Sequence, residues 1–401
     1  SNGSQHMRSD VNLPRFLTEY PLFLRKAGYY TTNNSKEDYN VTGHEQIWDE
    51  SSQDAHYKNR EEGQPFFAVF NFTESHEYAL RSDTETPYHD PKLAPVPPYH
   101  PDTREVRRDW ARYYHGISNI DKKVGEVLKQ LEEDGLADET IVFFYSDHGS
   151  GMPRHKRWPY NSGLHVPLII RVPERYRYLA PRDYEPGGAT KEPVSFVDLA
   201  PTLLSIIGLE PPEWMQGRSF MGHYETEPEK YLYGFRGRMD ERIDMVRSVR
   251  NERYVYIRNY MPHLIYGQYL PYMFLTKTTQ VWQNLYSENM LKPPKTYFWE
   301  PKPAEELYDL RADPNETINL ANSHLHTEVL EELREAHRKH ILNIRDTGFL
   351  PEAEMHRRAN GQPIYEMAQN RDLYPLERIF EIADLASNRD IAAVPKLIDA
   401  F

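Results

Sequence analysis

An aspartate and a histidine, Asp147 and His148, follow the apolar and aromatic run 141–145 after a single serine. A run of this kind that ends abruptly in polar residues predicts a buried strand of an α/β sheet. In open α/β sheets, ligands bind outside the carboxyl ends of the strands. A carboxylate and an imidazole at that place, with the basic run 154–157 next along the chain, suit a divalent metal that faces an anionic group. The tripeptide Asp-His-Gly taken alone is explained equally well by a turn.

The elements around this pair predict how it is positioned. A second apolar run, 65–72, predicts another buried strand, and the polar residues that follow it include His76. Apolar residues recur every three or four positions over 106–131, which predicts a long amphipathic helix leading into the strand at 141–145. A further strand is predicted at 166–172. Strand, helix and strand with short links predict a right-handed crossover in a largely parallel sheet.

The character of the chain changes after residue 212. We expect an α/β core at 1–212, a smaller α+β unit at 213–350 and a helical extension at 351–401. The extension has two helical patterns without a sheet to pack on, which resembles the opening of a helix-pair repeat. The other predicted elements are helices at 17–27, 194–208, 325–344, 376–386 and 391–401, an extended segment at 29–32, and strands at 231–235, 245–249 and 254–258.

Composition excludes several classes of protein. A net charge of −13 over 401 residues argues against a protein that binds duplex nucleic acid, which needs a concentrated basic face. No apolar run has the length of a membrane span, and no secretory signal pattern is present, so either the protein is cytosolic or its targeting segment is not in this sequence. Cysteine is absent, which excludes disulfides, thiolate metal sites and a thiol nucleophile within these residues.

Several segments, taken in order, resemble the sulfatases of the alkaline-phosphatase superfamily. The resemblance implies a largely parallel central sheet flanked by helices, then a smaller α+β subdomain with antiparallel strands and a helical tail. It also implies hydrolysis of a sulfuric ester, with a sulfated carbohydrate as the partner and a periplasmic or extracellular location. The matching segments are AGYYTTNNSK at 27–36, PFFAVFNFTESHE at 65–77, TIVFFYSDHG at 140–149, KRWPYNSGLHVPLIIRVP at 156–173, SFVDLAPTLLSIIG at 195–208 and EELYDLRADPNETINLA at 305–321.

The resemblance assigns roles to five residues. Asp147 and His148 match ligands of a divalent metal, Ca²⁺ by family, while Lys156 matches the lysine that contacts the sulfate. His76 matches the histidine at the leaving-group oxygen, and Lys36 matches the lysine beside the nucleophile. These roles agree with the chemistry, because an anionic ester with a poor leaving group needs fixed cations and a proton donor.

Some of these residues also have structural interpretations. Lys156 and Arg157 could belong to a solvated loop face, and His76 could cap its strand by a hydrogen bond. Trp158 and Tyr160 are expected to pack in the core. The sequence departs from the family at Asp38, where many members have a histidine.

The family's nucleophile motif is missing. The motif is Cys/Ser-x-Pro/Ala-x-Arg, and its first residue is converted to formylglycine. No such motif occurs in this sequence. The family's early strand that ends in paired aspartates is also missing. In the family both precede the segment with which this chain begins. We therefore expect the formylglycine to come from an N-terminal segment outside this chain and the isolated 401-residue chain to be inactive. Hydrolysis of an aryl sulfate with Ca²⁺ that Lys156→Ala abolishes would contradict this.

Two alternatives stay open. A phosphodiesterase or phosphonate hydrolase of the same superfamily shares the metal cradle, although the lysine pair and the run 160–163 favour sulfate. A non-catalytic binding protein is the other. The segment 235–268 is expected to contact a sugar through Arg236, Arg238 and His263. The sequence indicates neither the oligomeric state nor which sulfated substrate is used.

Overall fold

The structure is a computed structural model that describes residues 5–43, 46–81 and 89–399. It divides into two compact units, each built from three separate segments of the chain. The first unit comprises Ser1–Phe72, Val172–Leu232 and Asn343–Leu376, and the second comprises Thr73–Arg171, Tyr233–Leu342 and Glu377–Phe401. The domain boundaries expected at 212 and 350 stay a prediction.

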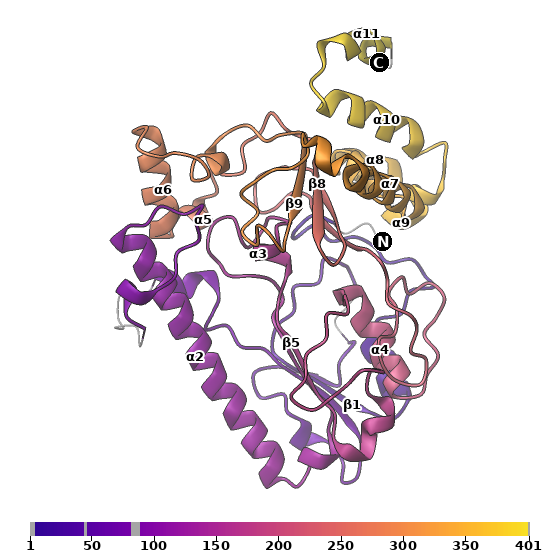
Figure 1. Cartoon of the computed structure of the whole chain (residues 1–401). Helices are drawn as coiled ribbons and strands as arrows, with labels where there is room; N and C mark the ends of the chain where they lie inside the picture. Colours follow the sequence, from indigo (N-terminus) through magenta and orange to yellow (C-terminus); the bar gives the residue numbers. More distant parts are fainter. Residues whose placement is uncertain (1–4, 44–45, 82–88, 400–401) are drawn as a thin grey trace. The chain divides into compact units, whose positions relative to one another are not determined.

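A parallel sheet forms the centre of the first unit. Strand β1 (Tyr30–Asn34), labelled in Figure 1, lies between β2 (Glu50–Ser51) and β3 (Phe66–Phe70). Both pairings are parallel. Helix α1 (Tyr20–Lys26) precedes β1, and the chain turns between them at Gly28, whose φ is +90°. That left-handed conformation favours glycine, as the predicted helix cap requires.

Within its described residues, the first unit also contains the α-helices α4 (Leu199–Ile206), α8 (Glu352–Ala359) and α9 (Ile364–Gln369). Helix α4 packs against α1 and follows a capping box in which Ser195 and Asp198 exchange side-chain and backbone hydrogen bonds. Helices α8 and α9 pack against each other.

The second unit contains one long helix, on which other elements of this unit pack. Helix α2 (Arg104–Glu133) begins after Thr103, whose hydroxyl accepts a hydrogen bond from the Val106 N–H at 3.4 Å. Its buried face includes Trp110 and packs against the turn that follows β3 and against helix α6 (Lys277–Ser287). The amphipathic pattern over 106–131 is thus confirmed as a helix. Helix α6 was not predicted, although its apolar residues Val281, Trp282, Leu285 and Tyr286 recur at helical spacing.

Strands β4 (Val142–Tyr145) and β5 (Leu168–Arg171) form an antiparallel pair. We expected β4 to join the strand at 65–72 by a parallel crossover, but in the described residues β3 pairs with β1, and β4 pairs with β5. The crossover prediction is therefore wrong at the level of strand pairing. The polar loop after β4, which contains the short helix α3 (Asn161–Leu164), reverses the chain so that β5 returns beside β4.

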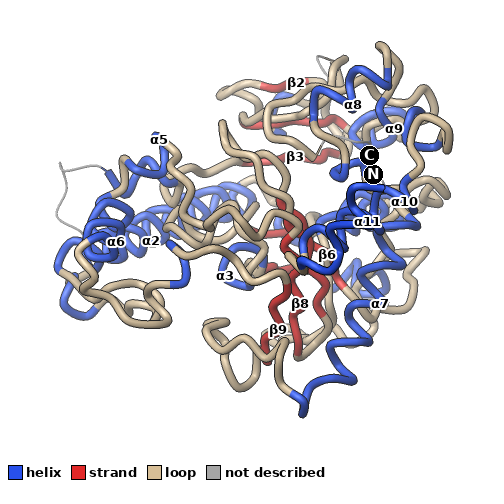
Figure 2. Tube along the Cα trace, turned by 90° about the horizontal axis from the view of Figure 1, so that it is seen from above, coloured by secondary structure: helices blue, strands red, loops and turns tan. Residues whose placement is uncertain are grey.

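A four-stranded sheet follows in the order β6 (Leu232–Arg236), β7 (Val246–Arg250), β8 (Tyr254–Asn259) and β9 (Glu305–Asp309). Its β7–β8 and β8–β9 pairs are antiparallel, and Figure 2 shows β8 and β9 side by side. The predicted strands and the tight turn between β7 and β8 are confirmed. An aromatic core that includes Trp158, Tyr160, Trp282 and Trp299 lies in this unit.

Helix α10 of the helical tail packs on this sheet, which corrects our expectation that the helix has no sheet to pack on. The Arg258 guanidinium of β8 donates to Asp384 Oδ1 at 2.8 Å and to Ser387 Oγ at 2.6 Å, both on α10 (Leu376–Ser387). Phe380 of the same helix contacts His337 of α7 (Thr327–Asn343). Helix α11 (Val394–Asp399) follows.

The predicted fold class is confirmed, since a parallel sheet with helices precedes an antiparallel sheet and a helical tail. Among the residues that the structure describes, no helix combines the length and the apolar character needed to cross a membrane.

Candidate active site

His76 and Lys156 lie in contact in the second unit. Lys156 Nζ is 3.3 Å from His76 Nε2, although the residues are 80 positions apart. His76 belongs to the turn that leads into the 3₁₀ helix Glu77–Arg81, and Lys156 belongs to the loop between β4 and α3. The structure thus brings two of the three predicted catalytic residues together, an ammonium group beside an imidazole.

A buried ion pair lies next to this contact. Glu77 and Arg157, which directly follow His76 and Lys156, pair through Oε2 and Nη1 at 3.0 Å, and their side chains are 0% and 3% exposed. Arg81 Nη2 lies 3.3 Å from Glu77 Oε1. Because Glu77 and Arg157 are each one peptide bond from a site residue, their pairing ties the two segments of the site together.

Arg157 is held in an unusual backbone conformation. Its φ is +85°, which costs a non-glycine residue about 1–2 kcal/mol. Its Nε donates to Asp240 Oδ2 at 3.0 Å, and its carbonyl accepts from Arg236 Nη1 at 2.6 Å. These bonds stabilise the loop conformation that presents Lys156.

The three predicted sugar contacts lie in different environments. Arg236 is only 2% exposed and donates to the Arg157 carbonyl, so its side chain holds the loop from the interior, and its role as a direct sugar contact stays a prediction. Arg238 donates to the Asp240 carbonyl at 2.6 Å and is half-buried, whereas His263 is exposed. The roles of Arg238 and His263 stay predictions.

Close packing at Gly151 gives a test of this arrangement. A Cβ atom on Gly151 would lie 2.6 Å from the Glu77 Cα, closer than real Cβ atoms come. We expect Gly151→Ala to lower the free energy of unfolding by about 1–3 kcal/mol, measured by denaturation with urea. The matched control is Gly125→Ala in α2, where a Cβ meets nothing within 4 Å and alanine favours the helix. Equal stabilities of the two variants would contradict the packing.

Two buried histidines lie close to Lys156: His155 precedes it in the same loop, and His100 bonds the loop backbone. His155 Nε2 is 2.8 Å from the Tyr99 hydroxyl, and His100 Nε2 is 3.0 Å from the Pro153 carbonyl. Burial lowers the pKa of His100 to about 3 and lowers the pKa of His155 well below its usual value. Burial also raises the pKa of Glu316 to about 7, against the pull of Arg154.

The two histidines and Glu316 are expected to have opposite effects on the free energy of unfolding in mild acid. The unfolded chain protonates the two imidazoles below pH 6.5 and the folded chain does not, so the free energy of unfolding falls by about 1 kcal/mol per imidazole between pH 7.5 and 5.5. Glu316 acts in the opposite sense, because the folded state takes up its proton near pH 7 and the unfolded state only near 4.5. We expect Glu316→Gln to lose about 2 kcal/mol more than the wild type over this interval in urea denaturation. An identical pH dependence of both proteins would show that Glu316 stays ionised.

Asp147 and His148 lie at the end of β4, as predicted. Asp147 Oδ2 is 3.6 Å from His148 Nε2, and the two side chains are 68% and 31% exposed. His148 Nδ1 lies 2.6 Å from the Gly149 carbonyl, to which it donates, so Nε2 is the acceptor nitrogen of the neutral ring. A carboxylate oxygen and an acceptor nitrogen therefore face each other. Over residues 5–43, 46–81 and 89–399, no group of three or more His, Asp or Glu residues could hold a metal.

Lys36 belongs to the first unit, after β1. Its Nζ is 3.2 Å from Asp38 Oδ2, and both side chains are exposed. Asp38, where many family members have a histidine, thus neutralises the predicted catalytic lysine. An exposed pair of this kind contributes little to stability.

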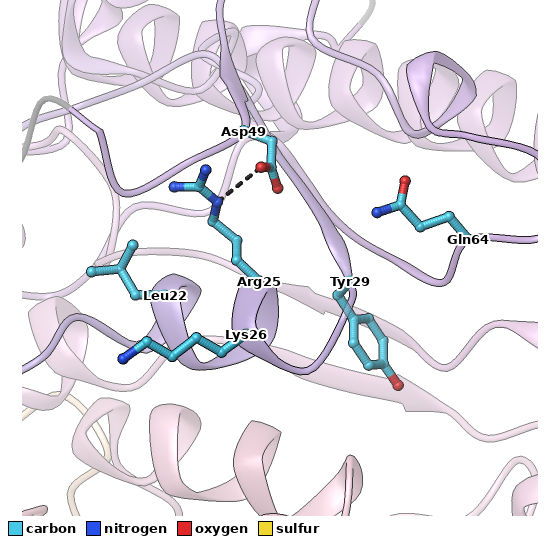
Figure 3. Close-up of a pocket in the computed structure, with 6 residues that line it drawn as sticks. All are labelled: Leu22, Arg25, Lys26, Tyr29, Asp49 and Gln64. Atoms are coloured by element: carbon cyan, nitrogen blue, oxygen red, sulfur yellow. Dashed lines mark hydrogen bonds and ion pairs between the residues drawn. The ribbon is translucent and has the colours of Figure 1, made fainter.

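A separate hollow of about 370 Å³ lies in the first unit. Figure 3 shows its lining, in which Arg25 Nε bonds Asp49 Oδ1 at 2.8 Å and the Lys26, Tyr29 and Gln64 side chains lie nearby. None of these lining residues was predicted to act in catalysis.

Comparison with known proteins identifies the family. The model of the family described as Sulfatase matches residues 2–209. The chain belongs to the sulfatase family. The model described as N-sulphoglucosamine sulphohydrolase, C-terminal, also matches this sulfatase, over residues 152–293.

Two relatives show how far the similarity extends. The "Ulvan-active sulfatase" of Formosa agariphila is 41% identical, over 91% of this chain and 69% of its own length. The human "N-sulphoglucosamine sulphohydrolase" is 28% identical, over 62% of this chain and 50% of its own. This sulfatase-family chain thus spans half to about two thirds of these relatives.

Two solved structures share the fold. A 2-O GAG sulfatase has a TM-score of 0.57 at 18% identity, covering 86% of this chain and 82% of its own. The phosphonate monoester hydrolase of Agrobacterium radiobacter has a TM-score of 0.54 at 16% identity, covering 84% and 82%. The fold alone therefore does not separate sulfate from phosphonate hydrolysis.

Proposed function

We propose that this protein hydrolyses sulfate esters of a carbohydrate. The observation that carries the proposal is the contact of the Lys156 ammonium with the His76 imidazole, at 3.3 Å, in a chain of the sulfatase family. An ammonium group stabilises the charge that develops on the sulfuryl oxygens, and an imidazole can protonate the departing alkoxide. The 41% identity to a protein named "Ulvan-active sulfatase" supports a polysaccharide substrate.

The three predicted catalytic residues and two of the three predicted sugar contacts have roles in this proposal. Lys156 binds a sulfate oxygen, His76 donates a proton to the leaving-group oxygen, and Lys36 supplies a second cation beside the nucleophile. The nucleophile is proposed to be a formylglycine, and the 401 residues contain neither a cysteine nor a serine in the motif from which it is made. Arg238 and His263 are proposed to contact the sugar. A periplasmic or extracellular location is part of the same proposal.

We also propose that Asp147 and His148 bind a divalent metal, Ca²⁺ by family. Their facing donor atoms, 3.6 Å apart, fit two positions of a coordination shell. Calcium takes six to eight ligands, mostly oxygen, so an ion here needs ligands beyond this pair. When bound, such a cation polarises the sulfate oxygens.

The test is the release of sulfate by the protein produced from its complete gene. We expect sulfate to be released from ulvan and from 4-nitrophenyl sulfate, and phosphonate monoesters and phosphodiesters to be cleaved much more slowly. Ion chromatography measures sulfate, and 4-nitrophenol release compares the three ester types. Faster cleavage of the phosphonate monoester would favour the alternative function, a phosphonate hydrolase, whose fold this chain shares.

A further inference from the structure

Two exposed tyrosines flank His76. The ring of Tyr78 is 5.0 Å from the His76 ring between centroids, and that of Tyr272 is 6.5 Å away. Tyr78 is 51% exposed and Tyr272 is 37% exposed, whereas the aromatic core of this unit is buried. Exposed aromatic rings beside a reactive site mark a surface that binds a ligand with an apolar face.

Both rings are held in place. The Tyr78 hydroxyl is 2.8 Å from Thr73 Oγ1. Tyr272 lies in the short helix α5 (Pro271–Phe274), where its carbonyl accepts from Arg81 Nη2 at 2.6 Å and the Arg81 guanidinium lies 4.0 Å from its ring centroid. Arg81 in turn contacts the buried Glu77. Rings that are already ordered lose little conformational entropy when they bind a ligand.

We propose that Tyr78 and Tyr272 form an aromatic platform that binds the sugar ring carrying the sulfate ester. This inference rests on the proposed function, because His76 is the group that meets the leaving-group oxygen and the leaving group is then the sugar. A pyranose has an apolar face of C–H groups that packs on an aromatic ring, and polar edges that the tyrosine hydroxyls can bond. Lys156, in contact with His76, receives the sulfate end of the same molecule.

The aromatic platform favours sulfate esters of sugars over other sulfate esters. A binding assay distinguishes contact with the rings from electrostatic attraction of the sulfate groups. The probes are dextran sulfate, a sulfated polymer of sugar rings, and polyvinyl sulfate, a sulfated polymer without rings. The affinity of the 401-residue chain for each is measured by titration calorimetry at fixed salt concentration. We expect dextran sulfate to bind the wild type more tightly per sulfate group.

The variants assign the difference to the two rings. Tyr78→Ala with Tyr272→Ala is expected to weaken binding of dextran sulfate about tenfold and to leave polyvinyl sulfate unchanged. Tyr78→Phe with Tyr272→Phe keeps the ring faces and is expected to restore binding to within about threefold. Tyr297→Ala, which removes a tyrosine that is 48% exposed, is the matched control and is expected to have no effect. Circular dichroism verifies that each variant is folded.

Three outcomes overturn the platform: equal binding of both polymers by the wild type, an unchanged affinity of the double alanine variant for dextran sulfate, or an equal loss with Tyr297→Ala. The proposed function is judged separately, by sulfate release. Tyrosine-dependent binding by the 401-residue chain, without any release of sulfate by the protein from the complete gene, would refute the proposed function and leave the platform as a sugar-binding surface.

Discussion

Replacing Lys156 by alanine is expected to lower the rate of sulfate release by about 10²- to 10³-fold, because it removes a fixed positive charge from the place where negative charge develops. The Lys156 ammonium lies 3.3 Å from His76, so both groups reach the same part of a bound ester. His76→Ala removes the proposed proton donor and is expected to cost about 10²- to 10⁴-fold for an alkyl leaving group.

Two substrates distinguish these roles on the protein from the complete gene. 4-Nitrophenolate leaves without protonation, so His76→Ala should affect 4-nitrophenyl sulfate much less than a sugar sulfate. Lys156→Ala should slow both by similar factors. Lys129→Ala, which removes a lysine with a 74% exposed side chain, is the control and should retain the wild-type rate. A Lys156→Ala rate within threefold of wild type, or equal effects of His76→Ala on both substrates, would contradict the assigned roles.

Replacing Glu77 by alanine is expected to lower the free energy of unfolding by about 3 kcal/mol, because it leaves the buried Arg157 guanidinium without one of its two carboxylate partners. Arg157 is 3% exposed in its side chain and lies 3.0 Å from Glu77. Asp240, also 3.0 Å from Arg157, still neutralises part of the charge, which places the loss at the lower end of the range for broken buried ion pairs.

The control is an exposed ion pair in the same unit. Glu252 pairs with Arg311, and their side chains are 58% and 59% exposed, so Glu252→Ala should cost less than about 1 kcal/mol. Urea denaturation measures both losses. The double variant Glu77→Ala with Arg157→Ala should lose less than the sum of the single variants, because it leaves neither charge unpaired. Additive losses, or equal losses from Glu77→Ala and Glu252→Ala, would show that the buried pair does not hold the site.

Local patterns in the sequence predicted most of the secondary structure. The three- or four-residue period over 106–131 predicted α2, and short apolar runs predicted β3, β4 and β5. These patterns depend on residues close together in sequence, so they can be recognised without knowing which segments pack together in space. The order of the motifs also predicted the family and pointed to His76 and Lys156, which the structure brings together.

The residues around the site could not be predicted in the same way. The sequence left open that Arg157 lies with Lys156 on a solvated loop face, but the structure buries Arg157 against Glu77, 80 positions away. Tyr78, two residues after His76, gave a local hint, but nothing in the sequence indicated that Tyr272 approaches the same ring. Arg236 has the chemistry of an anion-binding residue, and only its burial shows that it holds a loop.

The sequence by itself thus determined which segments are helical or extended and which residue types can handle a sulfate ester. Tertiary structure decided the strand pairings, with β4 beside β5 and β3 beside β1, and decided which charges are buried in pairs and which rings stay exposed beside His76. The physical reason is that helix and strand patterns arise from neighbours along the chain. Pairing, burial and exposure depend instead on contacts between residues far apart in sequence, to which no local period corresponds.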